Sequence, residues 1–302
     1  MNKILIVGSL NMDVVVKVES LPKAGETVLA NSLNYIPGGK GANQACAAGR
    51  LGGSVTMVGA VGEDGFAESI LKSLKDAGVD VCGVTRTKVP TGIALIPVDS
   101  SGENSIIVAA GANTQCDFGC IERCKPLIEA TQLLLAQMEI PYDAVYHAIE
   151  AASALGKVVI LNPAPTPKSI PDEIYACLDY ITPNETELES LSGMRTSNMR
   201  EIADAAEVLL KHGAKRVLVT CGAAGALLVT PDGSEHFPAP VVNAVDSTGA
   251  GDCFNAAFAV ALMEGKDDSQ AVRFACRAAA LSVTRLGAQY SMPNREEAEA
   301  FV

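Results

Sequence analysis

The stretch Val245–Asp252 (VDSTGAGD) joins a glycine-rich turn to a carboxylate, directly before a long apolar run. Its glycines allow the backbone to approach a ligand closely. The apolar run predicts a buried helix, and the first N–H groups of a helix have no partners within it. Such N–H groups, together with the helix dipole, favour an anion. We therefore expect the GAGD turn to bind an anion beside the carboxylate of Asp252.

Taken alone, the sequence GAGD is equally compatible with a plain turn whose acid complements the helix dipole. It is not the dinucleotide-binding pattern GxGxxG, because Phe254 stands where the third glycine belongs. It also lacks the Gly-Lys-Ser/Thr of a phosphate-binding P-loop. Its interpretation therefore depends on the rest of the chain.

A second glycine-rich turn, Pro37–Asn43 (PGGKGAN), leads into a predicted helix of small residues over 42–50. Turn chemistry alone requires neither a lysine nor so many glycines, and Lys40 and Asn43 both add hydrogen-bond donors. We predict a ligand site here too, although a flexible turn before a closely packed helix is also compatible with the pattern.

The composition narrows the class of protein. The chain has 302 residues, of which 48% are hydrophobic, enough for one large α/β domain. The net charge of −12 and the lack of a basic cluster argue against nucleic acid and anionic membranes as partners. No apolar run is long enough to span a bilayer, and the first residues are typical of a strand rather than a signal peptide. Nine cysteines without a CxxC pair predict no zinc site, so we expect a cytoplasmic protein with reduced thiols.

The elements that must position these turns follow from the hydrophobic pattern. Apolar strands alternate with helical segments along most of the chain, beginning with the buried strand 3–8 and including one helix near 118–130. This alternation predicts an α/β fold with a mostly parallel central sheet and helices on both faces. Strands within 12–36 and 91–110 interrupt the rhythm. We expect them to form a small β-sheet lid outside the main sheet, within a single domain over 1–302.

Polar groups follow several predicted strands at the point where each strand ends. They are Glu139, Asn162, Asn184 and Thr220, and the GAGD turn also follows a predicted apolar strand. In open parallel sheets, ligands bind outside the carboxyl ends of the strands. We therefore expect these groups to lie on one edge of the sheet.

Seven motifs in this order give the chain an end-to-end resemblance to a known family. They are GSLNMD, PGGKGANQA, LNPAP, ITPNETE, VTCGAAGA, VDSTGAGDCFNAAF and VTRLGAQYSMP. Each is weak alone, but the ordered set resembles the ribokinase family of ATP-dependent sugar kinases. The resemblance implies ATP with Mg²⁺, activation by K⁺, and phosphorylation of D-ribose at its 5-hydroxyl. It also implies a homodimer through the β-sheet lid.

The resemblance assigns roles residue by residue. Asp252 matches the catalytic base, and Gly249, Ala250 and Gly251 match the anion hole. The sugar-binding positions are Asn11, Asp13, Gly39, Lys40, Asn43, Glu139 and Asp252. The nucleotide and Mg²⁺ positions are Asn184, Glu187, Thr220, Gly222, Gly225 and Gly251. The monovalent-cation positions are Asp246, Thr248, Ser282, Arg285, Gly287 and Ser291, mostly through backbone carbonyls.

Several of these positions have simpler structural explanations. Asn11 and Asp13 also suit a turn between strands, and Glu139 an exposed strand end. Asn184 and Glu187 have the spacing of a capping box at a helix start, and both roles are compatible with each other.

Three other functions stay open from the sequence. The first is a kinase of the same family for deoxyribose, fructose or a nucleoside, although the chain is only 4% aromatic and a base needs an apolar shelf. The second is a non-catalytic sugar-binding protein, which would not need Asp252. The third is a dinucleotide oxidoreductase, which would want GxGxxG after the first strand.

Overall fold

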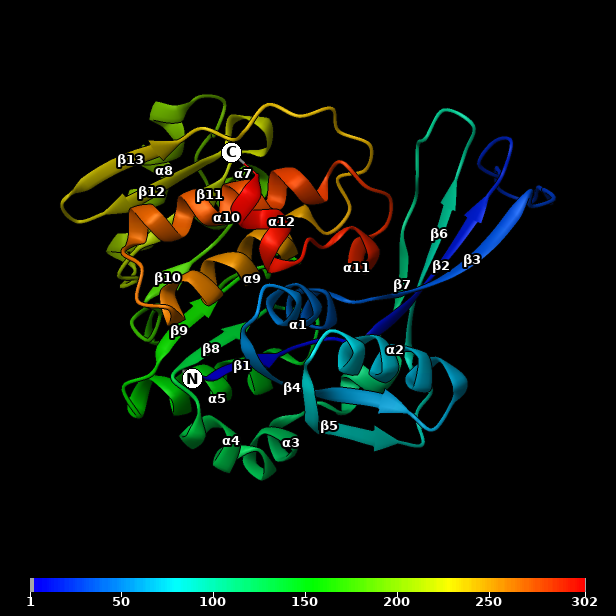
Figure 1. Ribbon diagram of the computed structural model, residues 1–302, viewed down its shortest axis with the longest axis horizontal. Coiled ribbons are helices and arrows are strands. Elements are labelled where there is room, and N and C mark those ends of the chain that lie inside the picture. The colour runs from blue at the N-terminus through cyan, green and yellow to red at the C-terminus, as the bar shows by residue number, and fades with distance from the viewer. Residues whose placement is uncertain (1–2, 302) are drawn as a thin grey trace.

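The computed structural model describes residues 3–301 and contains a nine-stranded, mostly parallel sheet (Figure 1). Its strands, in spatial order, are β13 (Gly233–Phe237), β12 (Ala226–Thr230), β11 (Val217–Thr220), β10 (Tyr180–Ile181), β9 (Val158–Leu161), β8 (Leu133–Ala136), β1 (Lys3–Val7), β4 (Ser54–Gly62) and β5 (Asp80–Thr87). Strands β12 and β13 form an antiparallel hairpin at one edge, β12 also pairs antiparallel with β11, and the remaining pairs are parallel. The predicted fold class is confirmed.

Helices cover both faces of this sheet, because its central strands are apolar on both sides. In β1, Ile4 and Ile6 pack on one face, whereas Leu5 and Val7 pack on the other. The first face carries α1 (Lys40–Arg50), α2 (Gly65–Asp76), α9 (Ala250–Met263), α10 (Asp268–Ser282) and α12 (Arg295–Ala300). The second carries α3 (Phe118–Arg123), α4 (Lys125–Ala130), α5 (Tyr142–Ala154), α6 (Asp172–Tyr175), α7 (Glu185–Ser192) and α8 (Met199–Lys211). The short elements η1 (Gly111–Gln115), η2 (Gly222–Ala224) and α11 (Ala288–Ser291) complete the set.

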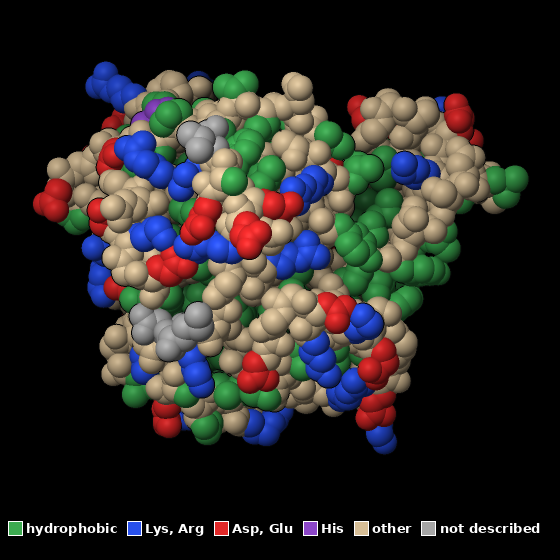
Figure 2. All heavy atoms as spheres, in the orientation of Figure 1, with side chains coloured by type: hydrophobic (Ala, Val, Ile, Leu, Met, Phe, Trp, Pro, Cys, Tyr) green, Lys and Arg blue, Asp and Glu red, His purple; other side chains and the backbone are tan. Residues whose placement is uncertain are grey.

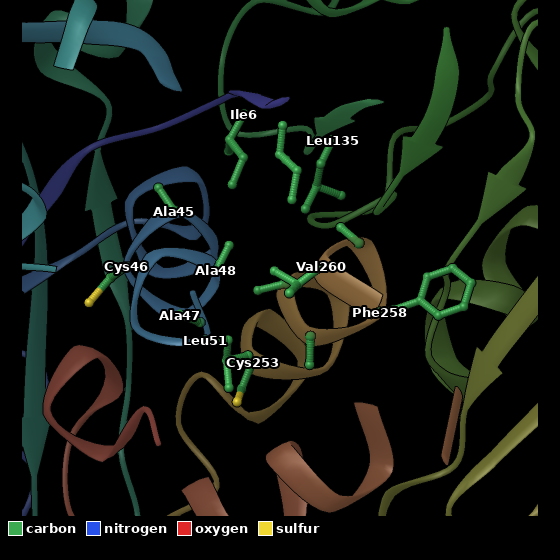
Figure 3. Close-up of a cluster of buried hydrophobic side chains, with 14 of the residues drawn as sticks. Ile6, Ala45, Cys46, Ala47, Ala48, Leu51, Leu135, Cys253, Phe258 and Val260 are labelled. Carbon is green, nitrogen blue, oxygen red and sulfur yellow. The ribbon is translucent and has the colours of Figure 1, made fainter. Parts of the chain in front are cut away.

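The contact between α1 and α9 brings the two glycine-rich turns together. Both helices are rich in buried alanine, and the close-up in Figure 3 shows Ala48 of α1 directed towards Val260 of α9. Small side chains allow helix backbones to approach closely. Each of these helices begins at one of the predicted ligand turns, so their packing sets the distance between the two turns.

A separate four-stranded sheet projects from the body of the molecule (Figure 1). Its order is β3 (Ser32–Gly38), β2 (Asn11–Lys17), β6 (Gly92–Val98) and β7 (Ile107–Ala109). The chain passes from β1 into β2 after only three intervening residues, and from β3 directly into α1. The second sheet is therefore tied to the central sheet at its base, next to the second glycine-rich turn.

The pairing register gives the second sheet two different faces. Tyr35, Val14, Leu95 and Ile107 are cross-strand partners and so share a face, whereas Asp13 points to the other. Figure 2 shows hydrophobic side chains gathered over this sheet, on the right of the molecule. In the described part of the chain, no helix is long and apolar enough to cross a membrane.

Three element boundaries differ from the sequence prediction. Strand β8 ends at Ala136 instead of reaching Glu139, because the Met138 N–H bonds to the Ala164 carbonyl at 2.9 Å. The helix expected near 118–130 is two helices, α3 and α4, which meet at Cys124. The GAGD turn follows an irregular segment after β13 rather than a strand of its own.

Candidate active site

Helix α9 begins at the GAGD turn as the sequence predicts. Gly249 caps the helix with φ 76°, and Asp252 lies in the first turn, only 6% exposed. The N–H of Ala250 donates to the Ser247 carbonyl at 3.2 Å. Among the described residues, the N–H groups of the turn that are left to meet an anion are therefore those of Gly249, Gly251 and Asp252, at the positive end of the helix dipole.

The carboxylate of Asp252 receives one amide donor on each oxygen. Asn43 Nδ2 donates to Oδ2 at 3.0 Å, and Gln44 Nε2 donates to Oδ1 at 3.0 Å. Both donors lie in the first turn of α1. Asn43 Oδ1 is buried without a partner among the described residues, so it is free to accept a hydrogen bond from a ligand hydroxyl.

The second glycine-rich turn brings β2 against the start of α1. Gly39 caps α1 with φ 87° and ψ 134°, a conformation that essentially only glycine adopts. A Cβ at this position would lie 2.7 Å from the backbone nitrogen of Asn11. The missing side chain thus allows Asn11 to lie next to the residues that follow Gly39.

Asn11 has its amide orientation set by a neighbour. Asn113 Nδ2 donates to Asn11 Oδ1 at 2.7 Å, while the Asn113 side chain also bonds both backbone polar groups of Leu10. The oxygen of Asn11 is therefore occupied, and its Nδ2 is the group that it can offer to a ligand. The sequence analysis did not single out Asn113.

Acidic groups surround one lysine in this region. Burial by itself lowers the pKa of Lys40, but the negative charges of Asp252, Glu139 and Glu187 outweigh burial and raise it, so Lys40 is charged. Its backbone N–H donates to Glu139 Oε2 at 3.1 Å, and the Ser9 hydroxyl donates to the same oxygen. The predicted sugar residues therefore form one cluster, although they come from β2, α1 and the end of β8.

Asp13 has the most altered acidity in this cluster. Burial, reinforced by the charges of Glu139 and Asp252, raises the pKa of Asp13 to about 7. The free protein thus holds Asp13 partly protonated at neutral pH. A cavity of about 370 Å³ is lined by Glu139 and by Val108 of β7, but the other predicted sugar residues do not line it.

A larger cavity, of about 560 Å³, lies on the other side of the GAGD turn. It contains all but one of the nucleotide positions predicted from the sequence: Asn184, Thr220, Gly222, Gly225 and Gly251. The sequence analysis missed much of its lining, including Ala239, Pro240, Val241, Val242, Ala244, Phe254, Cys276, Ala279, Ala280 and Val283. These residues are apolar. Phe254 of α9 and Val283, which follows α10, stand within two of the motifs, whereas the others come from the irregular segment before α9 and from α10, where no motif marks them.

Glu187 is the exception and lies outside that cavity's lining. Asn184 and Glu187 form the capping box of α7, with the Asn184 N–H donating to Glu187 Oε2 at 2.9 Å. Burial raises the pKa of Glu187, partly offset by that bond and by Lys40, and the nearby charge of Asp252 also raises it. Within residues 3–301, no three His, Cys, Asp or Glu side chains are grouped to hold a metal.

The predicted cation positions form a loop beside the GAGD turn. Asp246 accepts the N–H of Thr248 and the N–H of Gly287, each at 2.9 Å. Burial alone would raise the pKa of Asp246, but these hydrogen bonds lower it. The hydroxyls of Ser282 and Ser291 bond within their own helices, and Arg285 pairs with Glu297. The hydroxyls of Ser282 and Ser291 thus use their hydrogens within the helices, and Arg285, whose side chain has no oxygen, has only its backbone carbonyl to offer a cation.

The carboxylate of Asp252 is buried at a helix start, between a polar cluster and an apolar cavity. This arrangement is that of a phosphotransferase for a hydroxylated acceptor. The chain belongs to the pfkB family of carbohydrate kinases, whose family model matches residues 1–295. It is therefore an ATP-dependent phosphotransferase with a hydroxyl group as acceptor. The family predicted from the sequence is confirmed.

Relatives of known activity match along nearly the whole chain. A ribokinase of Bacillus subtilis is 41% identical, covering 99% of both chains. A deoxyribokinase of Salmonella typhi is 40% identical, covering 97% of this chain and 96% of its own. Among solved structures, a ribokinase of Thermotoga maritima has a TM-score of 0.92 at 42% identity, covering 100% of this chain and 99% of its own. Arabidopsis thaliana ribokinase complexed with ribose and ATP has a TM-score of 0.93 at 36% identity, covering 99% and 98%.

Proposed function

We propose that this protein transfers the γ-phosphoryl group of ATP to the 5-hydroxyl of D-ribose, giving D-ribose 5-phosphate. The observation that carries the proposal is the position of the GAGD turn between two different sites. Gly251 lines the 560 Å³ cavity, and the next residue, Asp252, is held by Asn43 within the polar cluster. One turn thus meets both the nucleotide and the sugar.

The polar cluster suits an uncharged polyhydroxylated ligand. Asn11 offers a donor through Nδ2, and Asn43 Oδ1 and the carboxylate of Asp13 offer acceptors. Such mixed groups are what the hydroxyls of a sugar need. Glu139 adds a further acceptor at the side of β7.

Asp252 acts as the general base in this proposal. Its carboxylate accepts the proton of the 5-hydroxyl while that oxygen attacks the γ-phosphorus. The transition state of phosphoryl transfer is loose, so strong deprotonation beforehand is not needed. Alignment of the hydroxyl and stabilisation of phosphoryl charge by the Gly251 and Asp252 N–H groups supply most of the rate enhancement.

Two metal ions belong to the proposal. Glu187 would hold a Mg²⁺ ion through a bound water, since Mg²⁺ prefers a few carboxylates together with phosphate oxygens. That ion would neutralise phosphate charge. A K⁺ ion would lie in the loop of Asp246, Thr248 and Gly287, with carbonyls of Ser282, Arg285 and Ser291, and would order the GAGD turn.

The second candidate acceptor is 2-deoxyribose. The deoxyribokinase relative is about as similar to this chain as the ribokinase relatives are. We further propose that the chain acts as one unit over 1–302, in the cytoplasm, with the second sheet as a lid over the sugar.

ATP-dependent phosphorylation of a sugar panel tests the proposal. The panel holds ribose, deoxyribose, fructose and adenosine, each with and without K⁺, and Asp252→Asn serves as the control for the base. We expect ribose to give the highest kcat/KM, K⁺ to stimulate it, and Asp252→Asn to lose at least about 100-fold in kcat with sugar binding kept. Preference for another acceptor would overturn the substrate, and turnover by Asp252→Asn like the parent would overturn the base.

A further inference from the structure

We infer that Gln44, held in turn by Gln137, is a positioning residue that aims the carboxylate of Asp252. The inference rests on the proposed role of Asp252 as the base. Both glutamines are polar side chains that are 0% exposed. Two buried amides next to a base therefore require an explanation.

The contacts of Gln44 link α1 to residues in or directly after three other elements. Its Nε2 donates to Asp252 Oδ1 at 3.0 Å and to Asn162 Oδ1 at 3.1 Å. Its Oε1 accepts from Gln137 Nε2 at 2.5 Å. Gln44 belongs to α1, Asp252 to α9, and Gln137 and Asn162 follow β8 and β9. The base is thus connected to the carboxyl edge of the central sheet.

Two groups that can only accept hydrogen bonds, the Asp252 carboxylate and the Thr182 carbonyl, set the orientation of each amide in this series of hydrogen bonds. A carboxylate faces Gln44, so its nitrogen must point to Asp252. The Thr182 carbonyl faces Asn162, whose Nδ2 donates to it at 3.2 Å. Asn162 then presents its oxygen to the nitrogen of Gln44. The oxygen of Gln44 is left for Gln137, which must donate.

Gln44 and Asn43 together fix the plane of the carboxylate. Each supplies one donor to a different oxygen of Asp252, and each comes from the rigid first turn of α1. Hydrogen bonds to the charged form also favour that form. The function of Gln137 is to prevent the Gln44 amide from rotating, since a rotated amide would turn its oxygen against the carboxylate.

Two substitutions at Gln137 separate positioning from mere packing. Gln137→Met keeps the volume but removes the donor, so the Gln44 amide loses its anchor. Gln137→Glu, when ionised, can only accept, and it attracts the nitrogen of Gln44 away from Asp252. Protonation of Glu at 137 restores a donor. We therefore expect the pH optimum of kcat for Gln137→Glu to be lower than that of the parent.

Gln44→Met is the direct test, measured as steady-state kinetics with ribose and ATP over pH 5.5–9. We expect kcat to fall about 10- to 100-fold, with KM for the sugar changed less than about threefold. We also expect the fall of kcat at acid pH to begin at a higher pH, since the carboxylate has lost a donor.

Thr131→Val is the matched control. Thr131 is a buried side chain whose hydroxyl donates to the carbonyls of Lys3 and Leu133, at the opposite edge of the same sheet. This variant also loses buried hydrogen bonds, but its kcat and pH profile should match those of the parent. If Gln44→Met loses thermal stability as Thr131→Val does but keeps the kinetics of the parent, the role of Gln44 is purely structural.

The outcomes distinguish this inference from the proposed function. If Asp252→Asn is inactive but Gln44→Met keeps parental kcat and pH profile, the inference is wrong and the base assignment stands. If the parent phosphorylates no sugar, the proposed function and the inference both fail. Gln137→Met leaves the side chains of Gln44 and Asp252 themselves unchanged and removes only the donor that anchors Gln44, so its loss of kcat decides the matter if Gln44→Met does not fold.

Discussion

At the scale of single residues, Asp13 connects the charge of the site to its function. Burial is the largest cause that raises the pKa of Asp13 to about 7, and the charges of Glu139 and Asp252 add to it. A carboxyl with a raised pKa becomes neutral as the pH falls through that value. The protonated form has lost part of its capacity to accept hydrogen bonds from sugar hydroxyls.

We therefore predict that sugar affinity falls about tenfold between pH 8 and pH 6. Isothermal titration with ribose, without nucleotide, measures it. In Asp13→Asn the affinity should be weaker but flat across this range. A parent whose affinity does not change with pH would show that Asp13 accepts no hydrogen bond from the sugar.

The sequence predicted the polar residues of the site but not those that orient them. Asn11, Asp13 and Asn43 stand in glycine-rich or strand-end motifs, which mark them. Gln44 stands in the motif PGGKGANQA without a predicted role, and Asn113 and Gln137 lie outside every motif. A buried amide has no periodicity, and its partners are distant in sequence. Their role exists only once β8, α1 and α9 meet.

At the scale of elements, the second glycine-rich turn controls how α1 meets β2. Gly39→Ala would impose strain on a backbone with φ 87° and place Cβ 2.7 Å from the Asn11 nitrogen. We predict a loss of about 2–4 kcal/mol in the free energy of unfolding, together with weaker sugar binding. Urea denaturation and titration with ribose measure the two effects.

Gly52→Ala provides the control for that prediction. Gly52 follows the other end of α1 and has φ 84°, but a Cβ there would have nothing within 4 Å. Its loss of stability should be about 1 kcal/mol, with sugar affinity unchanged. Equal losses in the two variants would mean that close approach to Asn11 is unimportant.

The sequence predicted which elements exist better than where they end. The break at Cys124 does have a local cause, since Pro126 lies within the first turn of α4 and lacks an N–H. The end of β8 has no local cause, because the chain leaves the strand to bond with the segment after β9. Such boundaries depend on tertiary contacts and cannot be read from a hydrophobic pattern.

At the scale of the whole molecule, the exposed face of the second sheet indicates a partner. Leu33, Tyr35 and Ile107 are more than half exposed, and Leu95 is 38% exposed. Cross-strand pairing places Tyr35, Leu95 and Ile107 on one face, with Val14 between them. An apolar row of this kind on a sheet is typical of an interface.

We predict a homodimer in which two such sheets cover each other. Light scattering after size-exclusion chromatography should give twice the chain mass of 31.2 kDa. Leu95→Asp should give a monomer that keeps its secondary structure, whereas Asp80→Asn, on the edge strand β5 of the central sheet, should remain dimeric. A parent that elutes as a monomer at micromolar concentration would contradict the prediction.

The proposed site takes its groups from the second sheet and from a helix of the main body, and this has an evolutionary consequence. In the proposed function, the second sheet supplies Asn11 and Asp13, which meet the acceptor, whereas α9 supplies Asp252, which performs the transfer. Mutations in β2 and its neighbours can change which molecule is chosen without damaging the reaction itself. A lineage built in this way can acquire new acceptors by changes in the second sheet while α9 is conserved by selection. Relatives named ribokinase and deoxyribokinase match this chain at 41% and 40% identity, so two acceptor names occur at nearly the same distance from it.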